Sequence, residues 1–165
     1  MLIKVMIWAC SLIFLTFFPT PRIPATEKVI IGEVEKITIL PWGINIEARI
    51  DSGASISSID VRDFVISGKR VKFRLPERAG GQQLELPHLG WRMVKSAGAG
   101  GQRRPVVEME ICLGGKKIKT PVTLSNRSLM EYPMVVGRQA IAGNFLIDVS
   151  QSNIHHSTCT QEEKP

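Results

Sequence analysis

Hydrophobic and polar residues alternate most regularly in residues 44–50, Ile-Asn-Ile-Glu-Ala-Arg-Ile, where every even position is apolar and every odd position polar. This period of two predicts a half-buried β-strand, because successive side chains of a strand point to opposite faces. The strand would end directly before Asp51.

The same period recurs in three other segments. Residues 71–75 alternate, and residues 107–113 and 118–124 alternate on either side of Gly114-Gly115. Two glycines between alternating segments are typical of a β-hairpin with a two-residue turn. These segments add strands, and a hairpin, to the strand at 44–50.

Helical signals are few. One short helix is expected at residues 138–142, closed by Gly143 and followed by an apolar strand at 145–149. Two glycine-rich loops, residues 79–81 and 97–101, are either mobile lids or plain linkers. The pattern predicts a mainly β fold, a small barrel of aliphatic strands with one short helix near the C-terminus.

The first 25 residues have the pattern of a secretory signal peptide. Lys4 precedes an apolar segment at 5–18, and three prolines follow before Ala25, where cleavage is expected. The protein would then be periplasmic or secreted, with a folded domain at 26–150 and a polar, disordered tail at 151–165. The alternative is an uncleaved signal that tethers the protein to the membrane. Only in that case would a membrane be one of its partners.

Charge adds only a mild preference. Of the net charge of +6 on 165 residues, +4 remains when Lys4 and Arg22 are removed with the signal. The basic residues are scattered and no aromatic residues alternate with them, so nucleic acid is not an expected partner. An attraction for acidic peptides remains open.

Two cysteines, Cys112 and Cys159, lie outside the signal. An exported protein could join them in a disulfide. Because Cys112 falls in a strand-like segment and Cys159 in a polar tail, we expect two unpaired thiols, although the sequence does not decide between the two states.

Two motifs could carry chemistry. Asp51-Ser52-Gly53-Ala54 follows the strand at 44–50, and Val135-Val136-Gly137-Arg138 precedes the expected helix. Alone, the first is also explained as a turn that ends a strand, and the second as a buried strand with a glycine before a helix. Their occurrence in this order favours a functional interpretation.

With both motifs present, the chain resembles the retropepsin-like aspartic proteases, which have an Asp-Ser/Thr-Gly-Ala loop and a later apolar-apolar-Gly-Arg motif beside it. It is most similar to the bacterial branch that has been called ATP-dependent zinc protease. The resemblance covers about residues 30–150, and its matching stretches are residues 48–54, 104–107, 126–141 and 145–148. It implies a retropepsin-like acid-protease barrel and peptide-bond hydrolysis.

The resemblance also implies a role for each motif residue. Asp51 would be catalytic, as one of two carboxylates that share a proton and activate a water molecule. The motif occurs once in the sequence, so the second carboxylate would be Asp51 of another copy, and the protein a homodimer. The supporting residues would be Ser52, Gly53, Ala54, Val136, Gly137 and Arg138.

These supporting roles differ. Ser52 would brace the paired loops, Gly53 would allow close approach of the backbone and substrate, and Ala54 would keep the floor of the site shallow. Arg138 would be a structural hydrogen-bond or ion-pair donor and not a catalyst. Which glycine-rich loop covers the site is left open.

Neither zinc nor ATP has a motif to hold it. The sequence has no His-Glu-x-x-His and no glycine-rich phosphate loop, so no metal or other cofactor is expected. A serine hydrolase lacks its Gly-x-Ser-x-Gly motif.

Two alternatives to a general peptidase remain. One is a non-catalytic periplasmic domain that keeps the protease fold but only binds a peptide or acts as a scaffold. The other is a hydrolase for glutamate-rich tails made by ligase systems.

Overall fold

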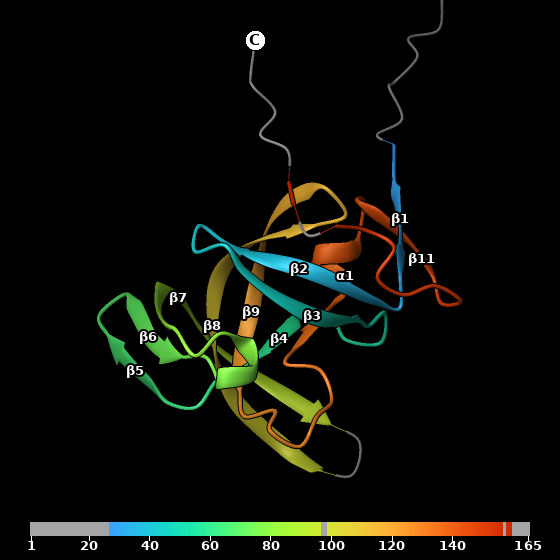
Figure 1. Ribbon diagram of the computed structural model, residues 1–165. Helices are drawn as coiled ribbons and strands as arrows, with labels where there is room; N and C mark the ends of the chain where they lie inside the picture. Colours follow the sequence, from blue (N-terminus) through green and yellow to red (C-terminus); the bar gives the residue numbers. More distant parts are fainter. Residues whose placement is uncertain (1–26, 97–98, 157, 160–165) are drawn as a thin grey trace, which may run out of the picture.

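The computed structural model describes residues 27–96, 99–156 and 158–159, and these residues form a mainly β fold (Figure 1). The elements of the barrel and its extension are β2 (Val34–Leu40), β3 (Ile44–Ile50), β4 (Ser57–Asp60), β5 (Phe64–Ser67), β6 (Arg70–Arg74), β7 (Gln83–Ser96), β8 (Ala99–Leu113), β9 (Lys116–Ser125) and β10 (Met134–Val136). The others are β1 (Val29–Gly32), β11 (Phe145–Asp148), the 3₁₀ turn η1 (Glu77–Ala79) and the helix α1 (Arg138–Ile141).

Six of the described strands close into a barrel. They pair in the order β2-β3-β10-β4-β9-β8, and β2 also pairs with β8, where Ile39 lies opposite Ile111. Strands β7, β6 and β5 extend this sheet beyond β8, while β1 and β11 form a separate parallel pair. The prediction of a mainly β barrel is confirmed.

The barrel interior is filled by aliphatic side chains. In β3 the apolar even positions are buried and the polar odd positions exposed, as the alternation of the sequence predicted. Ile37, Met109 and Leu124 are among the fully buried core residues from neighbouring strands. Burial of such a side chain stabilises a fold by about 1.5–3 kcal/mol, so the core fixes which face of β3 points outward and hence the direction of Asp51.

The predicted hairpin and helix are present. β8 and β9 meet at Gly114-Gly115, whose φ angles of 54° and 76° suit glycine in a two-residue turn. The helix α1 occupies four of the five expected residues and β11 follows it. The strand expected at 71–75 is β6.

The glycine-rich segment 97–101 is less of a loop than expected. Residues 99–101 belong to β8, which pairs with β7 to form a long hairpin, and residues 97–98 at its tip lie outside the described residues. Glycine has a low preference for strands, so composition alone favoured a loop. Pairing with β7 holds these glycines in the ladder instead.

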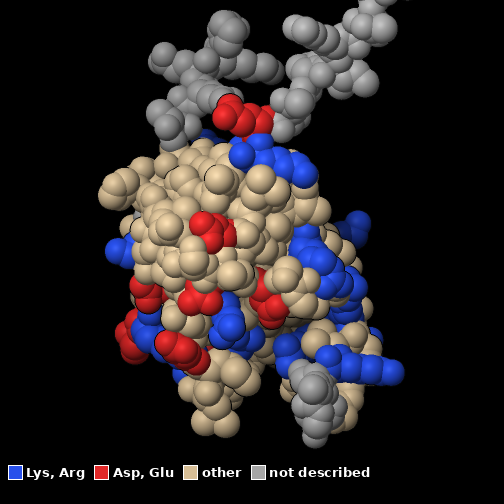
Figure 2. All heavy atoms as spheres, turned by 90° about the vertical axis from the view of Figure 1, so that its right-hand side faces the viewer, with Lys and Arg blue, Asp and Glu red and all other residues tan. Residues whose placement is uncertain are grey.

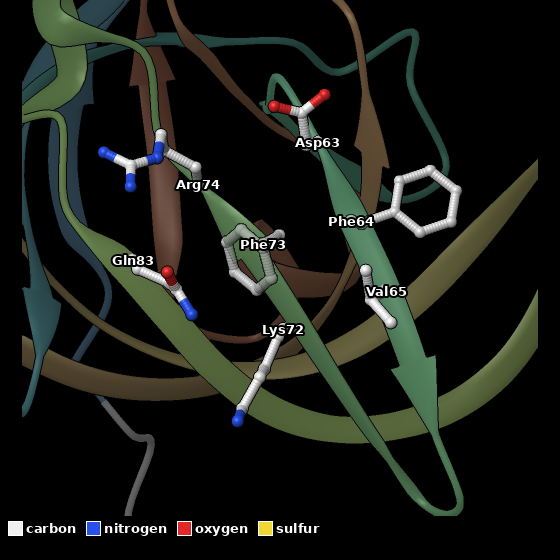
Figure 3. A pocket seen from close by; sticks show the side chains of 7 residues that line it. All are labelled: Asp63, Phe64, Val65, Lys72, Phe73, Arg74 and Gln83. Atoms are coloured by element: carbon white, nitrogen blue, oxygen red, sulfur yellow. The ribbon is translucent and has the colours of Figure 1, made fainter.

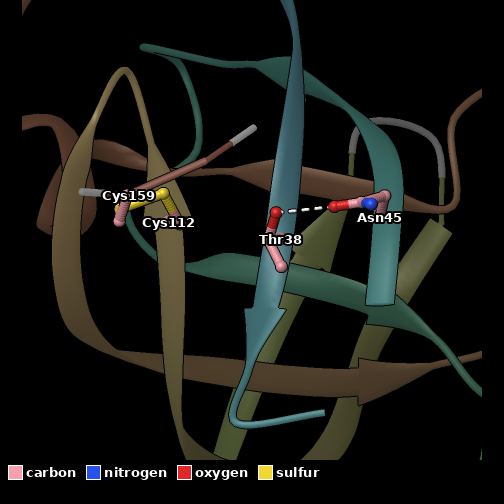
Figure 4. The surroundings of a disulfide bond; sticks show 4 residues. All are labelled: Thr38, Asn45, Cys112 and Cys159. Atoms are coloured by element: carbon pink, nitrogen blue, oxygen red, sulfur yellow. Dashed lines mark hydrogen bonds between the residues drawn. A yellow bond between two sulfur atoms is a disulfide. The ribbon is translucent and has the colours of Figure 1, made fainter. Parts of the chain in front are cut away.

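The expectation of two unpaired thiols is wrong, because Cys112 and Cys159 form a disulfide with their Cα atoms 5.6 Å apart (Figure 4). Cys112 lies in β8 opposite Thr38 of β2, and the Thr38 hydroxyl donates to the Asn45 side-chain oxygen of β3 at 2.6 Å. The disulfide thus attaches the segment that follows β11 to the barrel wall.

Described residues of the segment 151–165, where a disordered tail is expected, make hydrogen bonds with the folded domain. The Gln151 carbonyl accepts a hydrogen bond from the Glu33 N–H (2.8 Å), and the Asn153 N–H donates to the Val34 carbonyl (2.7 Å). The His155 N–H donates to Glu35, a buried carboxylate. A polar sequence suggested solvent, but its backbone groups find partners beside β1 and β2.

One face of the molecule, turned toward the viewer in Figure 2, is mostly uncharged in its upper part, with acidic and basic side chains gathered below. The exposed apolar residues Ile30 and Leu146 belong to β1 and β11, and exposed Val149 directly follows β11.

In the described part of the chain, no helix has the length and hydrophobicity needed to cross a membrane. The signal peptide expected at residues 1–25 lies outside that part.

Candidate active site

Asp51 stands at the end of β3, held by its own loop. Its backbone N–H donates to the Val136 carbonyl at 2.9 Å. Its Oδ1 accepts the Gly53 N–H at 2.8 Å and the Ala54 N–H at 3.2 Å. Among the described residues Oδ2 has no hydrogen-bond donor, so this oxygen is available to a ligand. Two backbone donors therefore orient the carboxyl group.

The second motif lies directly beside this loop. β10 pairs in parallel with β3, with Val136 opposite Ile50, and in antiparallel with β4. The Gly137 N–H donates to the Ser57 hydroxyl at 3.1 Å. A Cβ atom at Gly137 would lie 2.6 Å from the Ile56 carbonyl carbon, so only glycine fits between the loop and the start of α1.

Arg138 fastens the Asp51 loop from outside. Its Nη1 donates to the carbonyls of Ser52 (2.6 Å) and Gly53 (2.8 Å), and its backbone N–H donates to the Ala54 carbonyl (2.9 Å). One guanidinium thereby links the two motifs that are 86 residues apart in sequence. This geometry is that of a structural donor.

A cleft of about 890 Å³ opens beside Asp51. Its walls come from the Asp51 loop, from the arms of the β7–β8 hairpin and from the segment 126–133 between β9 and β10. Among its described lining residues Asp51 is the only carboxylate. The basic residues that line it are Arg49, Arg92, Lys95, Arg104, Arg127 and Arg138.

The predicted site residues are not equally placed in this cleft. Asp51, Gly53, Ala54 and Arg138 line it, while Val136, Gly137 and the exposed Ser52 lie around the loop but are not lining residues. The structure therefore brings the two motifs together as one unit.

Sequence reasoning missed the cationic wall. In the sequence Arg49 is only the polar side of a strand, and Arg104 is only one of several scattered basic residues. They face one cleft because the fold brings β3, β8 and the segment 126–133 around it, a consequence of topology that has no local sequence signal. The matching stretches at 104–107 and 126–141 contain Arg104 and Arg127, and are the one available hint.

The positions of two of these arginines, Arg104 and Arg127, disfavour the positive charge of their guanidinium groups. Burial holds the pKa of the Arg127 guanidinium below its usual range, and the nearby Arg104 and Arg78 lower it further, against the opposing effect of Asp60 and Asp51. Burial also lowers the pKa of Arg104. Cations that lack full solvation and repel one another gain from an anionic ligand.

The two glycine-rich segments differ in their relation to the cleft. Arg92, Met93, Val94 and Lys95 on β7 line the cleft, so the β7–β8 hairpin forms one of its walls, although none of residues 99–101 lines it. The other segment, 79–81, begins at the last residue of η1, and a Cβ at Gly80 would be 3.1 Å from the Ile44 side chain. It contributes no described residue to the cleft.

A second hollow, of about 290 Å³, lies between β5 and β6 (Figure 3). Phe64 and Phe73 supply its apolar surface, and Asp63, Lys72 and Arg74 its charges. It shares no described lining residue with the cleft. Its charged residues therefore offer matched controls for those around Asp51.

Metal ligands do not gather in the described residues. No group of three or more His, Cys, Asp or Glu side chains there could hold a metal ion. His88 packs edge-on against Trp91 at 5.9 Å between ring centroids, and His155 contacts the Ile30 carbonyl through Nε2 at 2.6 Å. Neither histidine lines the cleft.

Several curated proteins that are similar to this chain are named probable alpha-L-glutamate ligases. A probable alpha-L-glutamate ligase of Shewanella pealeana is 34% identical over 135 residues, which are 76% of this chain and 30% of that protein. One of Parasynechococcus marenigrum is 30% identical over 137 residues, or 78% and 29%. This chain thus spans less than a third of the length of these curated relatives.

The match to a solved structure covers nearly the whole of the other protein. A crystal structure of a Legionella pneumophila protein of unknown function superposes with a TM-score of 0.68 and 30% identity, covering 78% of this chain and 98% of that one. Residues 30–158 match the RimB-like family, described as retropepsin-like aspartic endopeptidase RimB. Because this match includes both the Asp51 loop and the Gly137-Arg138 motif, the chain belongs to the RimB-like family of retropepsin-like aspartic endopeptidases.

Proposed function

We propose that this protein is an exported, homodimeric aspartic endopeptidase in which Asp51 from each of two copies activates one water molecule. The observation that carries this proposal is the single carboxylate of the cleft. Asp51 is oriented by two backbone donors, yet no second carboxylate lines the cleft in the described part of the chain. A two-carboxylate mechanism therefore needs Asp51 of a second copy across a two-fold axis.

The reaction uses one proton shared by the two carboxyl groups. The ionised carboxylate takes a proton from water as the water oxygen attacks the peptide carbonyl carbon, and its partner protonates the carbonyl oxygen. The tetrahedral intermediate then breaks its C–N bond: the carboxyl group that took a proton from water gives it to the nitrogen, and the other carboxylate takes a proton from a hydroxyl of the intermediate. A new carboxyl terminus and a new amino terminus leave, and the pair again holds one proton.

The substrate we propose is an acidic peptide, in particular a glutamate-rich one. Six basic side chains against one carboxylate make the described cleft wall strongly cationic, which favours anionic ligands and speeds their association. The relatives whose names include alpha-L-glutamate ligase point to the same chemistry, because a ligase product is a substrate that a hydrolase of this kind would cleave.

Export is supported by the disulfide and by the N-terminal pattern. Disulfides such as Cys112–Cys159 persist in oxidising compartments and are rare in the cytosol. The segment 1–25 supplies an apolar signal, with cleavage near Ala25.

A second candidate function is peptide binding without hydrolysis. The cationic cleft is assembled within one chain, whereas the carboxylate pair is not. A chain that stays monomeric would thus keep a site for acidic peptides and lose the means to cleave them.

Cleavage and binding are separated by one experiment on glutamate-rich and glutamine-rich peptides of equal length. The wild-type chain is expected to cleave the glutamate-rich peptide, and Asp51→Asn to bind it without cleaving it. Asp63→Asn is the matched control, because Asp63 lies in the second hollow. Cleavage that survives in Asp51→Asn would contradict the proposal, and binding without cleavage in the wild type would favour the second candidate.

A further inference from the structure

The segment 126–133, which joins β9 to β10, forms one wall of the cleft without belonging to any strand or helix. It brings Arg127 and Met130 to the cleft that contains Asp51. A surface segment with no ladder of its own needs other partners to hold one conformation. Its backbone carbonyls and N–H groups show where these partners are.

Arg78 of η1 is the first partner. Its Nη1 donates to the carbonyls of Met130 (2.7 Å) and Glu131 (3.2 Å), and its Nη2 donates to the carbonyl of Arg127 (2.7 Å). A single guanidinium thus binds three carbonyls of the segment. Only arginine has enough donors in a fixed plane for this arrangement.

Asp60, at the end of β4, is the second partner and is fully buried. Its Oδ1 accepts the Arg127 N–H at 2.7 Å, its Oδ2 accepts Arg78 Nη2 at 2.7 Å, and its own N–H donates to the Pro133 carbonyl at 2.7 Å. Asp60 therefore binds both ends of the segment and the arginine that binds its middle. Figure 1 shows η1, in green, next to the orange segment after β9.

We propose that Asp60 and Arg78 form a clamp that positions Arg127 as an anion-binding residue of the cleft. Neither Asp60 nor Arg78 lines the cleft, so they act through the segment 126–133 as positioning residues. The proposal rests on the proposed function for the nature of the ligand, an acidic peptide. It does not depend on whether that peptide is cleaved.

The energetics give a reason for a clamp. Arg127 sits partly buried near Arg104 and near Arg78 itself, an arrangement that burial and like-charge repulsion both disfavour. Without a restraint its side chain would relax toward solvent and the segment would follow. The buried carboxylate of Asp60 supplies that restraint from outside the cleft. One of its oxygens accepts the Arg127 N–H, and the other accepts Arg78 Nη2. The clamp thus keeps a cation in place before the anion arrives.

The test is fluorescence anisotropy with labelled hexaglutamate and labelled hexaglutamine, using the full chain with Asp51→Asn so that no cleavage occurs. In that parent, Arg78→Lys keeps the positive charge, but the three donors of an ammonium group cannot bind Asp60 and all three carbonyls at once. It is expected to weaken hexaglutamate binding about tenfold, the effect of losing one charge-assisted contact, and to leave hexaglutamine unchanged. Arg74→Gln, in the second hollow, is the control and should have little effect.

A double-mutant cycle with Arg127→Gln separates positioning from general stability. If Arg78 acts through Arg127, Arg78→Lys should cause no further loss in the Arg127→Gln background. Equal losses in both backgrounds, or unchanged hexaglutamate binding in Arg78→Lys, would overturn the clamp.

Hydrogen exchange gives a readout that needs no ligand. The Arg127 amide, bonded to Asp60, should exchange faster in Arg78→Lys while the amides of β3 remain protected. Unchanged exchange at Arg127 would also overturn the clamp. If the Asp51→Asn parent does not bind hexaglutamate, the proposed anion site is wrong. If the wild-type chain binds hexaglutamate but cleaves no peptide, only the proposed protease activity is contradicted.

Discussion

The two sides of the cleft differ in how they are built. The Asp51 side is built from two short motifs: Gly53 and Ala54 orient the carboxylate, and a single arginine, Arg138, binds the loop from the start of α1. The opposite side is assembled from segments far apart in the chain, and its segment 126–133 depends on Asp60 and Arg78 for its conformation. This contrast teaches that the chemistry of the site is encoded in short motifs, whereas its charge selectivity comes from topology.

The largest expected effect is on the cleavage rate and comes from a substitution on the Asp51 side of the cleft. Asp51→Asn removes the acid/base group and should lower the cleavage rate of a glutamate-rich peptide by about 10³-fold or more, since general acid–base catalysis typically contributes 10²–10⁴-fold. Peptide binding should persist, because the cationic wall is intact. The measurement is steady-state cleavage beside anisotropy, and a rate as high as that of Asp63→Asn would refute the role of Asp51.

A second prediction concerns the disulfide, which lies on neither side of the cleft. Replacing Cys112 and Cys159 together with serine should lower the free energy of unfolding by about 2–4 kcal/mol, because the crosslink no longer restricts the unfolded chain. Urea unfolding measures this. The peptide affinity should not change at temperatures well below unfolding, and a collapse of affinity in the folded variant would show that the tail supports the cleft.

Gly137→Ala tests the contact between the two motifs. The added methyl group would lie 2.6 Å from the Ile56 carbonyl carbon, so the loop or α1 must shift, at a cost of about 2–3 kcal/mol. Gly100→Ala is the matched control, because a Cβ atom at Gly100 would have no described atom within 4 Å. Equal unfolding free energies for the two variants would contradict the tight packing.

The assembled side is probed by Arg104→Gln and Arg127→Gln. Each should raise KM or Kd for a glutamate-rich peptide by about tenfold and change a glutamine-rich peptide little, with the loss shrinking at high salt. Arg74→Gln provides the comparison outside the cleft. If both peptides lose affinity equally, the wall does not select for charge.

The smallest expected effect is that of pH. Two carboxyl groups that share one proton need one of them protonated, so cleavage should be several-fold faster near pH 5 than near pH 8. A pH–rate profile measures this, with folding checked at both ends of the range. A flat profile would count against the carboxylate pair.

Much of the fold could be predicted from the sequence because its signals are local. The strict alternation of residues 44–50 predicts β3 with its observed bounds, and Gly114-Gly115 marks the β8–β9 turn. The closure of β2 on β8 and the long β7–β8 hairpin depend on pairing between distant residues, which periodicity does not encode.

The site shows the same limit. The Asp51 and Gly137-Arg138 motifs are recognisable because each lies within a few residues. Asp60 has no Ser/Thr-Gly after it and Arg78 has no sequence signal at all, since their importance comes from contacts with the segment 126–133. The Cys112–Cys159 disulfide was missed for the same reason.

The central claim is that each active site contains Asp51 from two chains. It is tested most directly by mixing wild-type and Asp51→Asn chains at constant total concentration, after conditions that let subunits exchange. If both carboxylates are needed, activity should fall as the square of the wild-type fraction, to about one quarter for an equal mixture. A linear fall, to about one half, would show that one chain is sufficient and would contradict the account.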